Sequence, residues 1–338
     1  MRIATRSFLV GRSFVKEADF TVHEWRELLE LAAELKAEKH DHVVRQRLAG
    51  KNLALLVEKA SIRSRCAFEV AAYDEGAHVS YLDLASSPLG HQEPVADLAR
   101  VLGRTYDGIG FSGSDQGAVE LLAEHAGVPV WNASSDQWHP TQSLADTLTM
   151  SEHVRKPLRD ISFAYVGDAR SNVANSLLVT GAMLGMDVRM VAPQDLWNPA
   201  DVRREADRYA AESGASLRQT EDIADGVRGV DFVCTDAWVE TGQSVEVWRE
   251  RVQLLAPYQV NQRLLDLTGN PEVRFMHRLP AFHDRGATVD AHLHEATGMR
   301  ALEVTDDVFG STHSIVFDQA ENQMHAIKAV MVATLGER

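Results

Sequence analysis

The chain has 338 residues, of which 45% are hydrophobic and 25% are charged, a composition typical of a soluble globular protein with about two domains. Its 34 Lys and Arg residues against 49 Asp and Glu residues give a formal net charge of −15. This acidic balance disfavours nucleic acid and anionic membranes as general partners, and the sequence has no run of about 18 apolar residues that would predict a transmembrane helix.

The first half of the chain alternates helix-like and strand-like segments. Thr21–Arg47 is predicted to be a helix because its apolar residues recur at three- and four-residue spacing, and Thr21 with Glu24 can form a capping box. Further strands are expected at 52–57, 77–82, 108–111 and 128–131, and further helices at 61–75, 94–104, 117–126 and 140–153. Strands separated by helices of this length predict a parallel sheet that is covered on both faces.

The same pattern restarts near residue 150. Strands are expected at 162–166, 187–191, 232–234 and 274–276, and helices at 172–184, 199–213, 245–256, 261–267 and 320–335. The predicted fold class is therefore α/β, with two consecutive doubly wound parallel-sheet domains.

The two cysteines and the first ten residues indicate the cellular compartment of the protein. Cys66 and Cys234 belong to no Cys/His cluster with zinc-ligand spacing, so we predict neither a disulfide framework nor a structural metal. Both are expected to be buried apolar residues. The first ten residues lack the apolar run of a secretory signal, and we expect a cytoplasmic protein.

The strongest candidate binding site follows the first strand. Ligands of open α/β sheets collect at the carboxyl ends of strands, where helix N-termini present free N–H groups. Here Ser61, Arg63 and Ser64 stand in the opening turn of a helix directly after a buried strand. Dipole, N–H groups and guanidinium together favour a phosphate or carboxylate ligand. A serine cap beside solvated arginines accounts for the same pattern about equally well.

Other strand ends carry weaker candidates. His139 precedes a helix that starts with proline and could donate to a developing oxyanion. Asn172 and Asp236 follow two strands of the second half, and an Asp–Asn pair suits an α-ammonium group. Each has a structural alternative, since loop histidines are commonly structural and Asn and Asp commonly close turns. Arg278 follows the last strand and is expected to face the same region.

Six stretches of the chain carry motifs in a fixed order: EKASIRSRCAFE at 58–69, ARVLGRTYDGI at 99–109, HPTQ at 139–142, YVGDARSNVANS at 165–176, LPAFHD at 279–284 and FDQAENQMHAIKAVMVATL at 317–335. Together they resemble the ornithine carbamoyltransferases of the aspartate/ornithine carbamoyltransferase family. The resemblance implies a carbamoyl-phosphate domain at 1–149, an amino-acid domain at 150–318 and a helix at 319–338 that packs back on the first domain. It also implies an enzyme without metal or organic cofactor, assembled as a homotrimer or a multiple of trimers.

The resemblance further implies roles for the matching positions. In the family a neutral amine attacks the carbamoyl carbon and phosphate leaves, so cations must surround the phosphate and donors must meet the carbonyl oxygen. Arg63 and His139 would act at that oxygen. Binding would fall to Ser61, Arg63 and Ser64 on the phosphate, Gln142 and the Leu279 carbonyl on the carbamoyl NH₂, and Asn172 and Asp236 on the amino acid.

Several positions depart from the family pattern. Ile62 stands where the family usually has Thr, and Ser112 and Gln323 stand where it has Arg. Arg278, which we also count as a candidate catalytic residue, replaces the Cys of its H-C-L-P motif, and its Ser-Met-Gly acceptor loop reads Glu240-Thr241-Gly242. Losing two phosphate-facing arginines removes roughly 3–6 kcal/mol of donor binding. Because the changes cluster, we expect a transferase for an ornithine-like amino acid with a rebuilt donor pocket that changes donor or acceptor.

Three alternatives stay open. The first is an ordinary ornithine carbamoyltransferase of arginine-related biosynthesis, which makes citrulline and phosphate from carbamoyl phosphate and ornithine. The second is another reaction on the same scaffold, such as hydrolysis or phosphate-independent group transfer. The third is a non-catalytic paralogue kept for binding or assembly.

Overall fold

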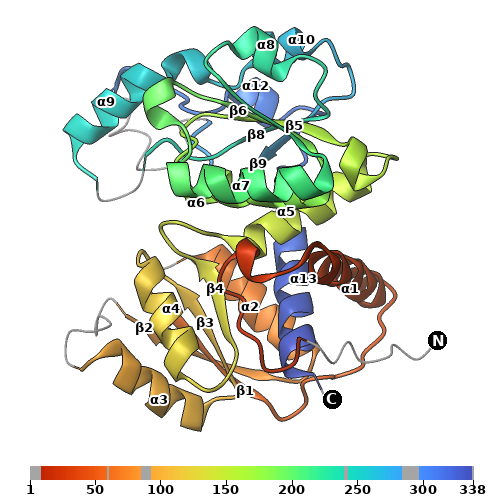
Figure 1. The fold of residues 1–338 in the computed structure, drawn as a ribbon, viewed down its shortest axis with the longest axis vertical. Coiled ribbons are helices and arrows are strands. Elements are labelled where there is room, and N and C mark those ends of the chain that lie inside the picture. Colours follow the sequence, from red (N-terminus) through yellow and green to blue (C-terminus); the bar gives the residue numbers. More distant parts are fainter. Residues whose placement is uncertain (1–8, 59–60, 85–92, 240–242, 284–296, 337–338) are drawn as a thin grey trace. The chain divides into compact units, whose positions relative to one another are not determined.

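The computed structural model describes residues 9–58, 61–84, 93–239, 243–283 and 297–336. The chain divides into two compact units, one of Met1–Leu148 with Glu321–Arg338 and the other of Thr149–Ala320. Each unit is built around its own parallel sheet (Figure 1). The expectation of two parallel-sheet α/β domains is confirmed.

The first unit has a four-stranded parallel sheet in the order β2-β1-β3-β4. Its strands are β1 (Asn52–Val57), β2 (His78–Asp83), β3 (Gly108–Ser112) and β4 (Val130–Ser134). β1 is apolar and buried after its first residue, as a strand covered on both faces must be. The helices that belong to this unit wholly or in large part are α1 (Val22–His40), α2 (Ile62–Asp74), α3 (Val95–Thr105), α4 (Gln116–His125), α5 (Pro140–His153) and α13 (Val316–Leu335), with a 3₁₀ turn η1 at Glu17–Asp19.

The last helix packs on the first one. Lys36 Nζ of α1 donates to Asn322 Oδ1 of α13 at 2.8 Å, across 286 positions of sequence, and Figure 1 shows the two helices side by side. α13 therefore completes the hydrophobic interior of the first unit although it comes last in the chain.

The second unit has a five-stranded parallel sheet in the order β7-β6-β5-β8-β9. Its strands are β5 (Ser162–Val166), β6 (Asp187–Val191), β7 (Ser216–Thr220), β8 (Phe232–Thr235) and β9 (Arg274–His277). The helices are α6 (Asn172–Leu184), α7 (Ala200–Ser213), α8 (Ile223–Val227), α9 (Val245–Leu255), α10 (Gln262–Thr268) and α12 (Asp306–Phe309), with 3₁₀ turns η2 at Leu158–Asp160, η3 at Gln194–Leu196 and η4 at Ala256–Tyr258.

In each sheet, the strand order reverses at one pair of neighbouring strands. In the first unit the chain runs from β1 to β2 on one side and returns to β3 on the other, so the strand order reverses between β1 and β3. In the second unit the same reversal occurs between β5 and β8. Loops that leave the carboxyl ends of such a pair diverge, and the space between them is where doubly wound folds bind ligands.

Several details differ from the sequence predictions. α12 was not predicted, and β4 runs over Val130–Ser134 rather than 128–131. The first helix ends at His40 rather than at Arg47, because Asp41 caps it and His42 adopts a left-handed backbone with φ 57°. β7 and α8 were not predicted, since the SLRQT segment is a half-buried edge strand without an apolar run. The last helix begins at Val316, four residues early. Cys66 is exposed, whereas Cys234 is buried as expected; α2 buries Ala67, Phe68, Ala71 and Ala72 instead.

None of the helices within the described residues is long and apolar enough to cross a membrane.

Candidate active site

In the first unit, the loops after β1 and β3 are tied together at the point where the sheet reverses. Glu58 N–H donates to the Ser112 carbonyl at 2.9 Å. In return, the Glu58 carboxylate accepts hydrogen bonds from the Ser114 N–H and hydroxyl at 2.7 and 2.8 Å. A Cβ on Gly113 would lie 2.4 Å from the Phe111 ring and 2.8 Å from the Glu58 carboxyl carbon, so a larger residue there would displace one or both side chains.

The α2 N-terminus holds the residues predicted to grip a phosphate. Ser61 is the N-cap, with its Oγ accepting from the Ser64 N–H at 3.3 Å, and the Ser64 hydroxyl donates to the same oxygen at 3.1 Å. Arg63 and Ile62 are exposed in the first helical turn. The two serines therefore form a hydroxyl pair at the positive end of a helix, a place that favours anions.

The α5 N-terminus holds the two residues predicted to contact a carbamoyl group, both buried. His139 is 3% exposed, and its Nδ1 lies 3.4 Å from the Thr141 hydroxyl. Gln142 Nε2 donates to Asp146 Oδ1 at 2.7 Å. This bond fixes the orientation of the amide, and the other amide atom, Gln142 Oε1, is buried with no hydrogen-bond partner among the described residues. A buried unpaired acceptor is costly unless a ligand supplies the donor.

Gln323 and Ser112 are the positions at which the family pattern has arginine. Ser112 ends β3 and is partly buried, and Gln323 is a partly buried residue of α13. Both belong to the first unit. Each side chain is neutral, so neither supplies positive charge there.

In the second unit, the reversal between β5 and β8 brings the predicted amino-acid residues to one sheet edge. Asn172 opens α6 behind its N-cap Ser171, and Asp236 is 6% exposed just after β8. Tyr165 of β5 donates to or accepts from Ser171 Oγ at 2.9 Å. Burial, with the nearby Asp236 carboxylate, raises the pKa of Tyr165 well above its ordinary value, so the phenol stays neutral.

Arg278 joins this edge and pairs with Asp236. Its Nη2 lies 3.5 Å from Asp236 Oδ2, and the Arg278 side chain is 27% exposed. The sheet register explains the pair, because Thr235 of β8 lies opposite His277 of β9, and Asp236 and Arg278 are the next residues of the two strands. Arg278 Nε is buried and lacks a hydrogen-bond partner within the described part of the chain.

Leu279 sits in a backbone conformation that the neighbouring histidine supports. Its φ is 58°, in the left-handed region that is unfavourable for a non-glycine residue. Leu279 N–H donates to His277 Nδ1 at 2.9 Å. The other ring nitrogen, Nε2, lies 3.3 Å from Glu303 Oε1, and both side chains are fully buried. Glu303 Oε1 also accepts from Phe282 N–H at 2.6 Å.

Of the predicted site residues, Ser61, Ile62, Arg63, Ser64, Ser112, His139, Gln142 and Gln323 lie in the first unit, and Asn172, Asp236, Arg278 and Leu279 lie in the second. Glu240 and Thr241 lie outside the described residues. Sequence reasoning missed Asp146, although its i, i+4 spacing from Gln142 on a helix was a signal. It also missed Glu303, which no local pattern connects to His277.

The chain matches one protein family along nearly its whole length. Residues 12–152 match the carbamoyl-P binding domain, and residues 159–334 match the Asp/Orn binding domain, of the aspartate/ornithine carbamoyltransferases.

Solved structures give the same result. The chain is 38% identical to the ornithine carbamoyltransferase from Pyrococcus furiosus, over 97% of this chain and 98% of that one, with a TM-score of 0.87. It is 35% identical to the Thermus thermophilus ornithine carbamoyltransferase, over 96% and 99% of the two chains, with a TM-score of 0.78. It is 34% identical to the Gloeobacter violaceus ornithine carbamoyltransferase, over 97% of this chain and 99% of that one, with a TM-score of 0.80.

Two doubly wound sheets with polar residues at both reversal points define a ligand-binding α/β protein of two domains. The chain belongs to the aspartate/ornithine carbamoyltransferase family. It is accordingly a transferase enzyme of the carbamoyltransferase type.

Proposed function

We propose that this enzyme transfers a carbamoyl group from a carbamoyl-phosphate-like donor to the side-chain amine of an ornithine-like amino acid, with a changed selection of donor or acceptor. The neutral amine attacks the carbamoyl carbon, the new C–N bond forms, and the C–O bond to phosphate breaks. The phosphate leaves with the electron pair of the broken bond and takes up the proton that the amine gives up, so that a ureido product and hydrogen phosphate result. The pairing of Arg278 with Asp236 carries the proposal of changed selection.

The donor side is supported by side chains of the first unit. Ser61, Ser64 and Arg63 surround the N-terminus of α2 and suit a phosphate or a similar anion. Gln142 Oε1 suits the carbamoyl NH₂, because the bond from Gln142 Nε2 to Asp146 leaves an oriented, buried acceptor. His139 would polarise the carbamoyl carbonyl.

The first unit lacks positive charge at two positions where the family pattern has arginine. Ser112 and Gln323 are neutral, so about 3–6 kcal/mol of anion binding is absent if each arginine contributes a charged hydrogen bond. Arg278 is the one cation added among the departures from the family pattern, but its guanidinium lies against Asp236. This arrangement favours a donor with less negative charge than a phosphate dianion. If carbamoyl phosphate is the donor, the enzyme should bind it more weakly.

The acceptor side is altered by the same arginine. Asp236 would otherwise be free to bind the ammonium group of an amino acid, and Arg278 competes with that group for its carboxylate. A cation beside the reacting amine also favours the neutral, nucleophilic form. With Nε of Arg278 buried and unpartnered among the described atoms, the site suits an acceptor that carries an additional anionic group.

A product assay tests the proposal. Purified enzyme is given carbamoyl phosphate with ornithine, and then with a panel of diamino acids that carry an additional carboxylate or phosphate, and ureido product is measured. We expect slow product formation from ornithine and faster formation from an anionic analogue. Ornithine turnover at an ordinary enzyme rate, roughly 1–10³ s⁻¹, would contradict the changed selection. Absence of ureido product with every acceptor would contradict the transferase proposal.

The oligomeric state, the location and the pathway are proposed from the resemblance to the carbamoyltransferase family. We propose a homotrimer, or a multiple of trimers, in the cytoplasm, in an arginine-related pathway. Sedimentation velocity of the purified chain would test the trimer, and a monomer at micromolar concentration would contradict it.

A further inference from the structure

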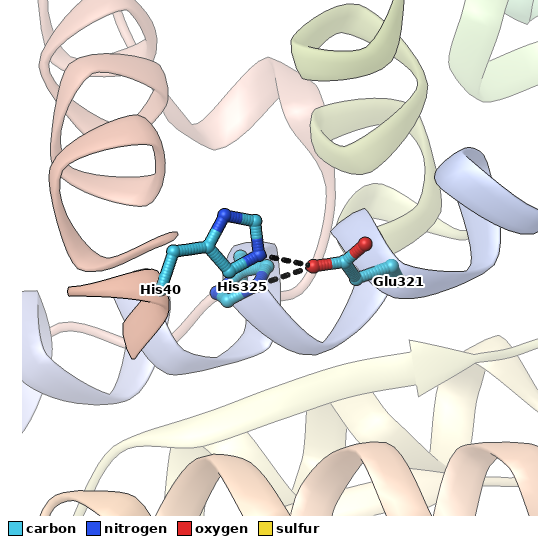
Figure 2. A group of neighbouring side chains, drawn as sticks. All are labelled: His40, Glu321 and His325. Atoms are coloured by element: carbon cyan, nitrogen blue, oxygen red, sulfur yellow. Dashed lines mark hydrogen bonds and ion pairs between the residues drawn. The ribbon is translucent and has the colours of Figure 1, made fainter. Parts of the chain in front are cut away.

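Three metal-ligand side chains of the first unit converge where the end of α1 meets α13 (Figure 2). His40 is the last residue of α1, and Glu321 and His325 are four residues apart on α13. His40 Nε2 lies 2.8 Å from Glu321 Oε1, and His325 Nε2 lies 3.5 Å from the same oxygen. One ligand atom from each residue lies within 4.8 Å of the other two. None of the three has a role in the proposed reaction.

His325 is the member that points to a ligand. Its side chain is fully buried, and both of its ring nitrogens lack a hydrogen-bond partner within the described ranges. Nε2 approaches Glu321 Oε1 at 3.5 Å without forming a hydrogen bond, and buried polar atoms that make no hydrogen bond cost free energy that a bound group would recover. Imidazole nitrogens are among the commonest metal ligands in proteins.

We propose that His40, Glu321 and His325 form a binding site for a divalent first-row transition metal ion, Zn²⁺ in particular. Two imidazole nitrogens and one carboxylate oxygen are a common zinc ligand set, with water in the fourth position. The hard cations Mg²⁺ and Ca²⁺ prefer oxygen ligands alone. The i, i+4 spacing of Glu321 and His325 puts both ligands on one face of α13.

The geometry requires one small movement. Ligand atoms about 2.1 Å from a tetrahedral zinc lie roughly 3.4 Å apart. The ligand atoms of the cluster lie within 4.8 Å of one another, so the widest separation must close by up to about 1.4 Å. His40 and Glu321 can make this movement, because their side chains are 57% and 42% exposed. The rings of His40 and His325 are perpendicular, with centroids 6.2 Å apart.

The surrounding charges set the affinity. Lys36 and Lys328 lie near His325, and the positive charge of each opposes the binding of a dication. Lys328 is compensated by Asp74, whose Oδ2 accepts from Lys328 Nζ at 2.6 Å, and Lys36 is hydrogen-bonded to Asn322. We therefore expect micromolar rather than nanomolar zinc binding. The bound ion would fasten the end of α1 to α13.

Zinc titration of the full-length, chelator-treated protein tests the site. Isothermal calorimetry with ZnCl₂ should give one ion per chain, and MgCl₂ should give none. His40→Ala and Glu321→Gln should each weaken zinc binding at least tenfold, and the double variant should lose both the binding and the zinc-dependent rise in Tm. These two positions are exposed, so the variants should keep the wild-type Tm without metal.

His23→Ala is the matched control. His23 is an exposed α1 histidine with Glu27 four residues on, 3.8 Å away, but no third metal ligand joins it among the described residues. Zinc affinity should be unchanged in this variant. In the Co²⁺ form, the visible spectrum should be that of a four-coordinate ion without a thiolate charge-transfer band. Zinc binding that survives in the double variant, or no heat up to millimolar zinc, would overturn the proposal.

Discussion

The guanidinium of Arg278 lies against the carboxylate of Asp236, with Nη2 and Oδ2 separated by 3.5 Å. The two residues are 42 positions apart, yet each directly follows a strand whose last residue faces the other's, Thr235 opposite His277. The parallel register of β8 and β9 therefore brings the two residues side by side. A carboxylate predicted to bind an amino acid is already engaged by a cation of the protein.

Removing this cation should change acceptor selection. In Arg278→Cys the Asp236 carboxylate becomes available to a substrate ammonium, and a hydrogen bond to a charged group contributes about 1.5–3 kcal/mol. We expect kcat/KM for ornithine to rise roughly 10- to 100-fold, and use of anionic acceptors to fall. Arg189→Ala is the control. Arg189 forms an ion pair with Asp187 at 2.7 Å on β6, which β5 separates from β8. A fall in ornithine kcat/KM in Arg278→Cys would count against this role.

Gln142 should control affinity for the donor. Gln142→Leu keeps the size of the side chain but removes the buried acceptor Oε1 and the bond to Asp146. We expect KM for the carbamoyl donor to rise roughly tenfold, the effect of about 1.4 kcal/mol. Thr147→Val on the same helix is the control, since it removes a buried hydroxyl bonded to the Ser143 carbonyl. An equal change in donor KM in both variants would show a general effect of helix packing.

His277 should support the backbone that carries Arg278 and Leu279. His277→Ala removes the acceptor of the Leu279 N–H and leaves Glu303, fully buried, without the ring beside it. A buried donor left without its acceptor costs about 1–3 kcal/mol, and the cavity left by the buried ring adds to this cost, so urea unfolding should show a total loss of about 3–5 kcal/mol. His313→Ala is the control, because a ring nitrogen of His313 forms a hydrogen bond with the Val273 carbonyl from a partly buried position, and we expect a loss of about 1 kcal/mol. Similar losses in the two variants would contradict the account.

Asp74 should make the stability of the first unit sensitive to acid. Burial alone would raise the pKa of Asp74, but hydrogen bonds from Lys328 and Lys39 outweigh it and lower the pKa. A carboxyl whose pKa is lower in the folded than in the unfolded chain stabilises the fold above about pH 4, and this contribution fades as pH falls through the folded value. Asp74→Ala should cost about 3 kcal/mol at pH 7, because Lys328 is only 2% exposed.

The difference in free energy of unfolding between wild type and Asp74→Ala should decrease as the pH falls from 5 towards 2. Urea unfolding at a series of pH values measures it. Lys39→Ala is the control. Lys39 binds the same Asp74 oxygen at 2.6 Å, but its side chain is 36% exposed, so its loss should cost no more than about 1 kcal/mol. A gap between wild type and Asp74→Ala that is independent of pH would contradict the linkage.

Local patterns were sufficient for most of the fold. α5 runs from Pro140 to His153 and β5 from Ser162 to Val166, as predicted, because a proline start, an apolar period and a buried run are all properties of neighbouring residues. β7 was missed because an edge strand that is only half-buried has no strong apolar signal. Cys66 was misplaced because a helix buries one stripe, and composition does not tell which residues lie in it.

The sequence by itself determined the class of the fold, the family and the residues at the strand ends, since each of these depends on short stretches read in order. Only the tertiary structure decided which of those residues meet. Arg278 reaches Asp236 through strand register, Glu303 reaches His277 across the second unit, and His325 comes beside His40 because the last helix packs on the first. Contacts between distant positions depend on how elements pack, and no local pattern records that packing.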